Sequence, residues 1–274
     1  MPMIVDLHNH AERSQNTDLR LEDYVRKARR LGVAVAITEH NRLYDRGGVV
    51  DGVLVLPGIE VLNDYGDFLV FGAPEDCVAY REIFALIDYV HRCGGVIIAA
   101  HPFSGYGVCR AVDPAMAGRI IARVDAVEVL NGRASAGDCE KARRLAMAHG
   151  KPGVGGSDAH RAGEMFRMGT RFERRIEGVG DLVREIRLGR CEAARIETSR
   201  WVGASFTGSR FHRPPRRPGW TKGRPGPCGR SRRWSTTWTF RSTSGRVDTE
   251  RGGHVGTLVR GEECGCSAMT WMLT

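Results

Sequence analysis

Up to about residue 200, short apolar runs rich in β-branched residues alternate with segments whose apolar residues recur at helical spacing. Such runs predict buried strands, and a repeat near 3.6 residues predicts helices that bury one face. The predicted strands span residues 3–7, 33–38, 53–56, 68–72, 96–100, 126–130, 152–155 and 194–197. The predicted helices span residues 20–31, 80–93, 114–123, 138–149 and 180–188.

Strands that alternate with helices predict an α/β fold with a parallel sheet, either open or closed into a barrel. Polar residues follow one predicted strand after another, as at His10, His40, Glu60 and His101. An open sheet gathers its functional groups at one switch point, whereas a barrel collects them from the carboxyl ends of many strands. The pattern therefore favours a barrel.

The composition changes abruptly near residue 200. Residues 200–274 contain fourteen basic and four acidic residues, a net charge of +10. The rest of the chain carries −1, so the tail accounts for the whole positive charge of +9, and all five tryptophans lie there. Without helical or strand periodicity, this tail is interpreted first as a frameshift product or other non-native sequence, then as a disordered segment. The least favoured interpretation is an arm that binds nucleic acid through Arg and Trp. We expect a domain over residues 1–199 and a basic tail over 200–274.

The chain has neither a basic stretch followed by an apolar run at its start nor an apolar run long enough for a membrane helix. We therefore expect a cytoplasmic protein without membrane attachment. Its eight cysteines lack paired spacing, and Cys264-x-Cys266 is too little for a zinc module, so reduced thiols are expected.

Asp6, His8 and His10 stand at the end of the first predicted strand with a spacing of two residues. Alternation along an extended chain would put their side chains on one face. Two imidazoles held in this way can bind one cation, and an acidic neighbour can orient a ligand. Asp158 and His160 repeat this spacing near the end of the domain.

Ligand-type residues recur after the strands between these two motifs. They include Glu39, His40, Glu60, His101 and Glu128. Any one of them alone is more simply a polar loop residue, but chance is a poor explanation for the whole set. Mixed imidazole and carboxylate ligands suit Mn²⁺, Zn²⁺ or Fe²⁺, and their number predicts two or three ions. Glu60 is the natural bridge between adjacent ions.

The ordered motifs resemble those of the PHP (polymerase and histidinol phosphatase) superfamily over residues 3–197. They read Asp6-x-His8-x-His10, Ile37-Thr38-Glu39-His40, Pro57-Gly58-Ile59-Glu60, Ala100-His101-Pro102 and Gly156-Ser157-Asp158-Ala159-His160. The resemblance implies a distorted seven-stranded (β/α)7 barrel and a metal-dependent phosphoesterase with a di- or trinuclear site.

The resemblance also implies a division of the ligands among three ions. His8, His10, Glu60 and Asp158 would hold one ion, Glu60 and His101 a second, and His40 and His160 a third. The sequence departs from the family pattern at Glu39, which replaces the usual Asp, and at Asp67, where His is frequent. Asp18 and Glu128 stand near positions at which some members supply a further His ligand. Each of Asp6, Asp18, Glu39 and Glu128 is a candidate for an additional metal ligand or for a residue behind the ligands.

The expected reaction is attack of a metal-bound hydroxide on phosphorus, with Asp158 or His160 assisting proton transfer. Arg13, Arg133 and Arg161 lie just beyond the motifs and are candidates for binding the substrate phosphate, although each is as readily a solvated surface residue. The expected substrate is a phosphate mono- or diester of a small metabolite or nucleotide. Two alternatives remain: a metal-dependent hydrolase of a non-phosphate bond, and a non-catalytic regulatory PHP module.

Overall fold

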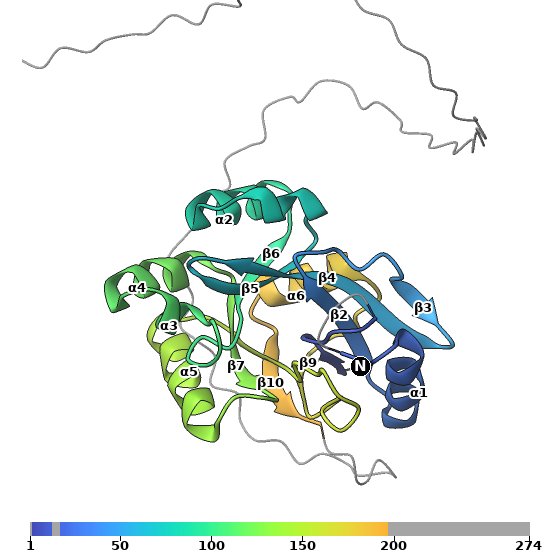
Figure 1. Ribbon diagram of the computed structural model, residues 1–274. Coiled ribbons are helices and arrows are strands. Elements are labelled where there is room, and N and C mark those ends of the chain that lie inside the picture. Colours follow the sequence, from blue (N-terminus) through green and yellow to red (C-terminus); the bar gives the residue numbers. More distant parts are fainter. Residues whose placement is uncertain (1, 13–16, 197–274) are drawn as a thin grey trace, which may run out of the picture. The chain divides into compact units, whose positions relative to one another are not determined.

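A computed structural model describes residues 2–12 and 17–196, which form an α/β domain around one ten-stranded sheet (Figure 1). The strands are β1 (Met3–Asp6), β2 (Ala34–His40), β3 (Gly48–Val50), β4 (Val53–Asn63), β5 (Gly66–Phe71), β6 (Val96–Ala99), β7 (Ala126–Asn131), β8 (Gly153–Gly156), β9 (Met168–Phe172) and β10 (Cys191–Arg195). The predicted tail and Arg13 lie outside the described residues.

The strand order is β10-β9-β1-β2-β4-β5-β6-β7-β8, with β3 paired to the start of β4. β1, β2 and β4 are mutually parallel, as are β6, β7 and β8, whereas β5 and β9 run antiparallel to their neighbours. The sheet curls into a nearly closed barrel that brings β8, at one end of the strand order, close to β9, near the other end. Thr170 Oγ1 of β9 joins them: it donates to Gly155 O of β8 at 3.0 Å and accepts from Gly155 N–H at 2.9 Å.

The predicted barrel class is confirmed, but the strand number and directions differ from a regular alternation. Residues 68–72 were predicted as a strand of the parallel series, whereas β5 returns antiparallel from β4 through a turn at Asp64 and Tyr65. β3 and β9 were not predicted, because Gly48–Val50 is very short and Met168–Phe172 interleaves Gly, Thr and Arg with its apolar residues.

The helices agree closely with the predicted segments. They are α1 (Leu21–Leu31), α2 (Ile83–Arg92), α4 (Pro114–Arg123), α5 (Ala136–Ala148) and α6 (Val179–Arg187), with the unpredicted short helices η1 (Glu75–Ala79) and α3 (Val108–Ala111). Gly32 ends α1 in the left-handed conformation, and Asp113 caps α4 by accepting from two backbone N–H groups. None of the helices within the described ranges is long and apolar enough to cross a membrane.

The inner face of the sheet holds an apolar cluster that includes Ala36, Leu56, Ile98 and Val154. Residues of α6 pack into the same cluster, and Arg187 of α6 donates to Gly95 O at the beginning of β6. α6 therefore covers the end of the barrel at which β6 starts. The carboxyl ends of the parallel strands, where His40, Glu60 and the other candidate ligands lie, are at the opposite end.

Candidate metal centre

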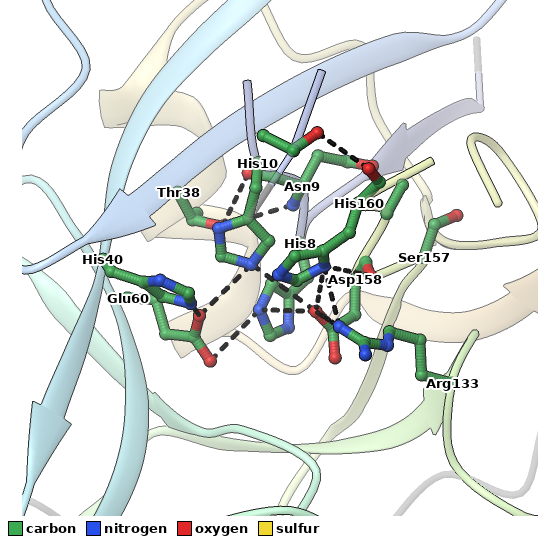
Figure 2. Close-up of polar contacts among 12 residues, drawn as sticks. His8, Asn9, His10, Thr38, His40, Glu60, Arg133, Ser157, Asp158 and His160 are labelled. Carbon is green, nitrogen blue, oxygen red and sulfur yellow. Dashed lines mark hydrogen bonds and ion pairs between the residues drawn. The ribbon is translucent and has the colours of Figure 1, made fainter. Parts of the chain in front are cut away.

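Glu60, near the carboxyl end of β4, contacts four imidazoles, three of which are labelled in Figure 2. Its Oε1 is 3.2 Å from His8 Nε2 and 3.1 Å from His101 Nε2. Its Oε2 is 3.2 Å from His10 Nε2 and 3.0 Å from His40 Nε2. Each oxygen of one carboxylate thus faces a different pair of rings, which is the arrangement required of a bridge between two cations.

Asp158 supplies a second carboxylate on the other side of His8 and His10. Its Oδ1 lies 3.7 Å from His8 Nε2, 3.4 Å from His10 Nε2 and 3.5 Å from His160 Nδ1, while Asn131 Nδ2 donates to its Oδ2 at 3.2 Å. The φ of Asp158 is 52°, a conformation that non-glycine residues seldom adopt. Unfavourable backbone conformations of this kind occur mainly at functional sites, where the surrounding structure holds a side chain in a required position.

The backbones of the first and last motifs are joined directly. Asp158 N–H donates to His8 O at 2.7 Å, and Asn9 pairs with Ala159 in an isolated parallel bridge. A Cβ on Gly156 would stand 2.3 Å from the Cβ of His8, so the contact requires glycine there. Two segments that are 150 residues apart in the chain therefore present their ligands to one point.

The donor set fits divalent metal ions. Three groups have ligand atoms within 4.8 Å of one another: His8, Glu60 and His101; His8, His10 and Asp158; and His10, His40 and His160. His8 Nε2 is buried and has no hydrogen-bond partner among the described residues, although it faces two carboxylates. Imidazole nitrogens and carboxylate oxygens aimed at common points suit Mn²⁺, Zn²⁺ or Fe²⁺.

The charges of these groups depend on each other. Burial by itself would raise the pKa of Glu60, but the charge of His8 and the contacts with the other imidazoles hold it well below its usual range. Conversely, burial would lower the pKa of His101, yet the hydrogen bond and charge of Glu60, with the charge of Glu128, raise it to about 9. Without metal, the raised pKa values of His8, His10 and His101 favour protons on these three rings, where cations would otherwise balance the carboxylates.

Glu128 of β7 positions two ligands. Its Oε1 lies 3.2 Å from His8 Nδ1, and its Oε2 accepts from His101 N–H at 2.8 Å and from Asn131 Nδ2 at 3.1 Å. Because the carboxylate contacts Nδ1, it directs His8 Nε2 toward Glu60 and Asp158. The sequence offered Glu128 as an additional ligand or a residue behind the ligands, and its contacts correspond to the latter.

Replacing Glu128 with Gln is expected to weaken metal binding about 10- to 100-fold, because an orienting partner of a metal-bound histidine contributes that much. Competition with a chelating dye would measure the dissociation constants. Glu82→Gln, a surface substitution, serves as the control. An unchanged metal affinity in Glu128→Gln would contradict the orienting role.

Two further predicted residues lie behind the cluster. Asp6 Oδ1 accepts from Ser157 N–H at 2.8 Å, and burial, partly offset by this bond, raises the pKa of Asp6 to about 7. Glu39 Oε1 accepts from Ala11 N–H at 3.0 Å. Both carboxylates thus bind the backbone of motif loops, although alternation within a single strand had suggested that Asp6 shares a face with His8 and His10. β1 ends at Asp6, so that alternation does not extend to the histidines.

Asp67 of β5 joins the cluster and was not among the predicted ligands. It is buried, and its Oδ2 lies 3.9 Å from His101 Nε2. Burial and the charge of Glu60 raise the pKa of Asp67 to about 7. The signal in the sequence was a position at which the resembling family frequently has His. By contrast, Asp18 is exposed on the segment that follows residue 16.

The two candidate arginines within the described residues differ in their surroundings. Arg133 Nη1 donates toward His160 Nδ1 at 2.8 Å and lies 3.9 Å from Asp158 Oδ1, and about half of its side chain is exposed. It therefore reaches the mouth of the cluster from the loop after β7. Arg161 is exposed, and its backbone N–H is bound by Glu164 Oε2 at 3.1 Å.

Comparisons with known proteins agree with this geometry. Residues 136–191 match the family described as PHP-associated. The chain is similar in structure to PsfC of Pseudomonas syringae, with 20% identity, a TM-score of 0.56, and coverage of 71% of this chain and 91% of that one. No curated protein shows significant sequence similarity to the chain.

Two longer proteins share the fold. A two-domain protein of Bacteroides vulgatus containing a predicted PHP-like metal-dependent phosphoesterase has 17% identity and a TM-score of 0.54, covering 72% of this chain and 65% of that one. The lesion-specific endonuclease PfuEndoQ of Pyrococcus furiosus has 17% identity and a TM-score of 0.54, covering 70% and 58%. This chain thus spans less than two thirds of either. The predicted resemblance to the PHP superfamily is confirmed by the PHP-associated segment and by this shared fold.

Proposed function

We propose that this protein is a metal-dependent phosphoesterase that hydrolyses a phosphate mono- or diester of a small metabolite or nucleotide. The observation that carries the proposal is the position of Glu60, with each carboxylate oxygen between two imidazoles. The seven predicted ligands, His8, His10, His40, Glu60, His101, Asp158 and His160, would hold two or three divalent ions. Bound divalent ions lower the pKa of water and withdraw charge from phosphoryl oxygens.

The remaining chemistry falls to side chains at the mouth of the cluster. His8 and His10 hold the pKa of the Asp158 carboxyl below its usual range despite burial, so the carboxylate is ionised at neutral pH and Oδ1 can accept a hydrogen bond from an attacking water. Burial lowers the pKa of His160, and its Nδ1 lies 3.5 Å from that oxygen, close enough to share the proton. Asp158 and His160 are therefore the proposed proton-transfer residues.

Arg133 is the proposed phosphate-binding residue. Its guanidinium is half exposed beside Asp158 and His160, and it retains donors beyond the one directed at His160. A planar guanidinium can donate two parallel hydrogen bonds to phosphoryl oxygens. Arg133 could thus hold an ester against the ligand cluster. Arg13 and Arg161 remain proposed as further phosphate contacts from the loops after the first and last motifs.

An assay of the full chain in Mn²⁺ is expected to detect hydrolysis of p-nitrophenyl phosphate, bis-p-nitrophenyl phosphate or a nucleotide. An oligonucleotide with an abasic site tests the activity named for the endonuclease that shares the fold. p-Nitrophenyl acetate tests the alternative of a non-phosphate bond. With metal bound, cleavage of the acetate alone would favour that alternative, and no cleavage at all would favour a regulatory module.

A further inference from the structure

The loop after β6, which begins at the proposed ligand His101, carries an exposed aromatic side chain. Tyr106 is 80% exposed, and it lies five residues after His101, one of the proposed ligands. Isolated exposed aromatic residues are common on protein surfaces and by themselves indicate nothing. This one differs because its backbone is held against the ligand.

Backbone hydrogen bonds hold the loop against the main chain of His101. Ser104 N–H donates to His101 O and Gly107 N–H donates to Ser104 O, both at 2.9 Å. Tyr106 O accepts from Asp67 N–H at 3.1 Å, which ties the loop to the start of β5. The backbone of Tyr106 is therefore fixed on both sides.

The two glycines that flank Tyr106 allow this close approach. Gly105 has φ 53°, and a Cβ there would meet the His101 ring at 3.8 Å. A Cβ on Gly107 would stand 2.1 Å from His101 O, so no other residue fits without a backbone shift. The loop thus holds the backbone of the tyrosine in a tight turn next to His101.

The loop of Tyr106 lies next to the loop of Arg133. β6 and β7 are parallel neighbours, so the segments that follow them leave the sheet at the same edge. His101 and Ser104 line one small cavity together with Asn131 and Ala134, the residues on either side of the Arg133 turn. The loops that carry Tyr106 and Arg133 are therefore neighbours.

We propose that Tyr106 determines specificity by stacking on the nucleobase of a phosphate ester whose phosphate lies at the metal centre. This inference rests on the proposed phosphoesterase function and narrows its substrate class to nucleotides. Bases stack on tyrosine through π-faces that all four bases share, so the contact selects for a base without selecting which one. A ring held by a fixed backbone loses little conformational freedom when the base binds.

The test compares adenosine 5′-monophosphate with ribose 5-phosphate, which carries the same sugar phosphate without the base. In the full chain with Mn²⁺, Tyr106→Ala is expected to raise KM for the nucleotide about tenfold or more, the usual effect of losing one stacking contact. KM for ribose 5-phosphate should be unchanged, and Tyr106→Phe should behave as wild type with both. Equal effects on the two substrates, or none on the nucleotide, would overturn the inference.

Val49→Ala provides a control at an equally exposed position on β3, remote from the cluster. Titration calorimetry of both ligands separates this inference from the proposed function. If the wild type hydrolyses neither ester, the phosphoesterase proposal fails for them. Wild-type binding of the nucleotide no tighter than that of ribose 5-phosphate would then reject the stacking role independently.

Discussion

Replacing Glu60 with Gln is expected to abolish hydrolysis and to remove metal from the protein. The substitution keeps the shape of the side chain but exchanges one oxygen for an amide nitrogen, which cannot bind a cation. Since both Glu60 oxygens face imidazole pairs, more than one ion should be lost. Metal activation of a phosphoester is worth several kcal/mol, so kcat/KM should fall at least about 10³-fold.

Elemental analysis of the purified variant checks this prediction alongside the kinetics. Glu177→Gln removes one negative charge from an exposed position and should keep both metal and activity. Circular dichroism serves as the control that the Glu60→Gln variant is folded. A folded Glu60→Gln protein with a full complement of metal would show that Glu60 is not the bridge.

After removal of the metal with a chelator, the protein is expected to lose stability as the pH rises, whereas the metal-loaded protein should gain stability. In the metal-free protein, the pKa of His101 is about 9. Burial would lower the pKa of His8, but the charges of the neighbouring carboxylates outweigh burial and raise it. A group whose pKa is higher in the folded state stabilises it fully below the unfolded value, near 6.5 for His. That stabilisation is lost as the pH rises from about 6.5 to 9.

For His101 alone the loss is on the order of 3 kcal/mol, or roughly 5–10 °C in Tm for a domain of this size. Metal binding requires neutral imidazoles, so the loaded protein should instead gain stability over the same pH range. Thermal melts at pH 6.5 and 9, with chelator and with Mn²⁺, measure both. Parallel pH profiles for the two forms would contradict a shared site for protons and metal.

The main elements of the fold were predictable from local pattern. Five helices were predicted within a few residues of their ends, because each buries one apolar stripe and several have glycine or aspartate at a boundary. The direction of β5 was not predictable in the same way. The apolar run Phe68–Phe71 fits a parallel or an antiparallel strand equally, and the turn at Asp64 and Tyr65 decides between them.

The candidate ligands were predictable because their residue types recur at the ends of successive strands. Their roles were not. Glu128 and Glu60 are both acidic residues in buried strands, yet one contacts His8 Nδ1 and the other contacts His8 Nε2. Asp67 lacked a motif of its own, and only the pairing of β5 with β6 brings it to His101.

The sequence by itself provided the candidate metal ligands, from His8 and His10 to Asp158 and His160, and the expectation that a barrel would gather them. These properties follow from residue type and from periodicity, which are local. The tertiary structure decided which atom of each side chain faces the centre, that Glu60 contacts four imidazoles while Glu128 contacts His8 from behind, and that Arg133 reaches Asp158 and His160. Those properties depend on strand register and loop packing between residues that are 27 to 120 positions apart in the chain, which no local pattern encodes.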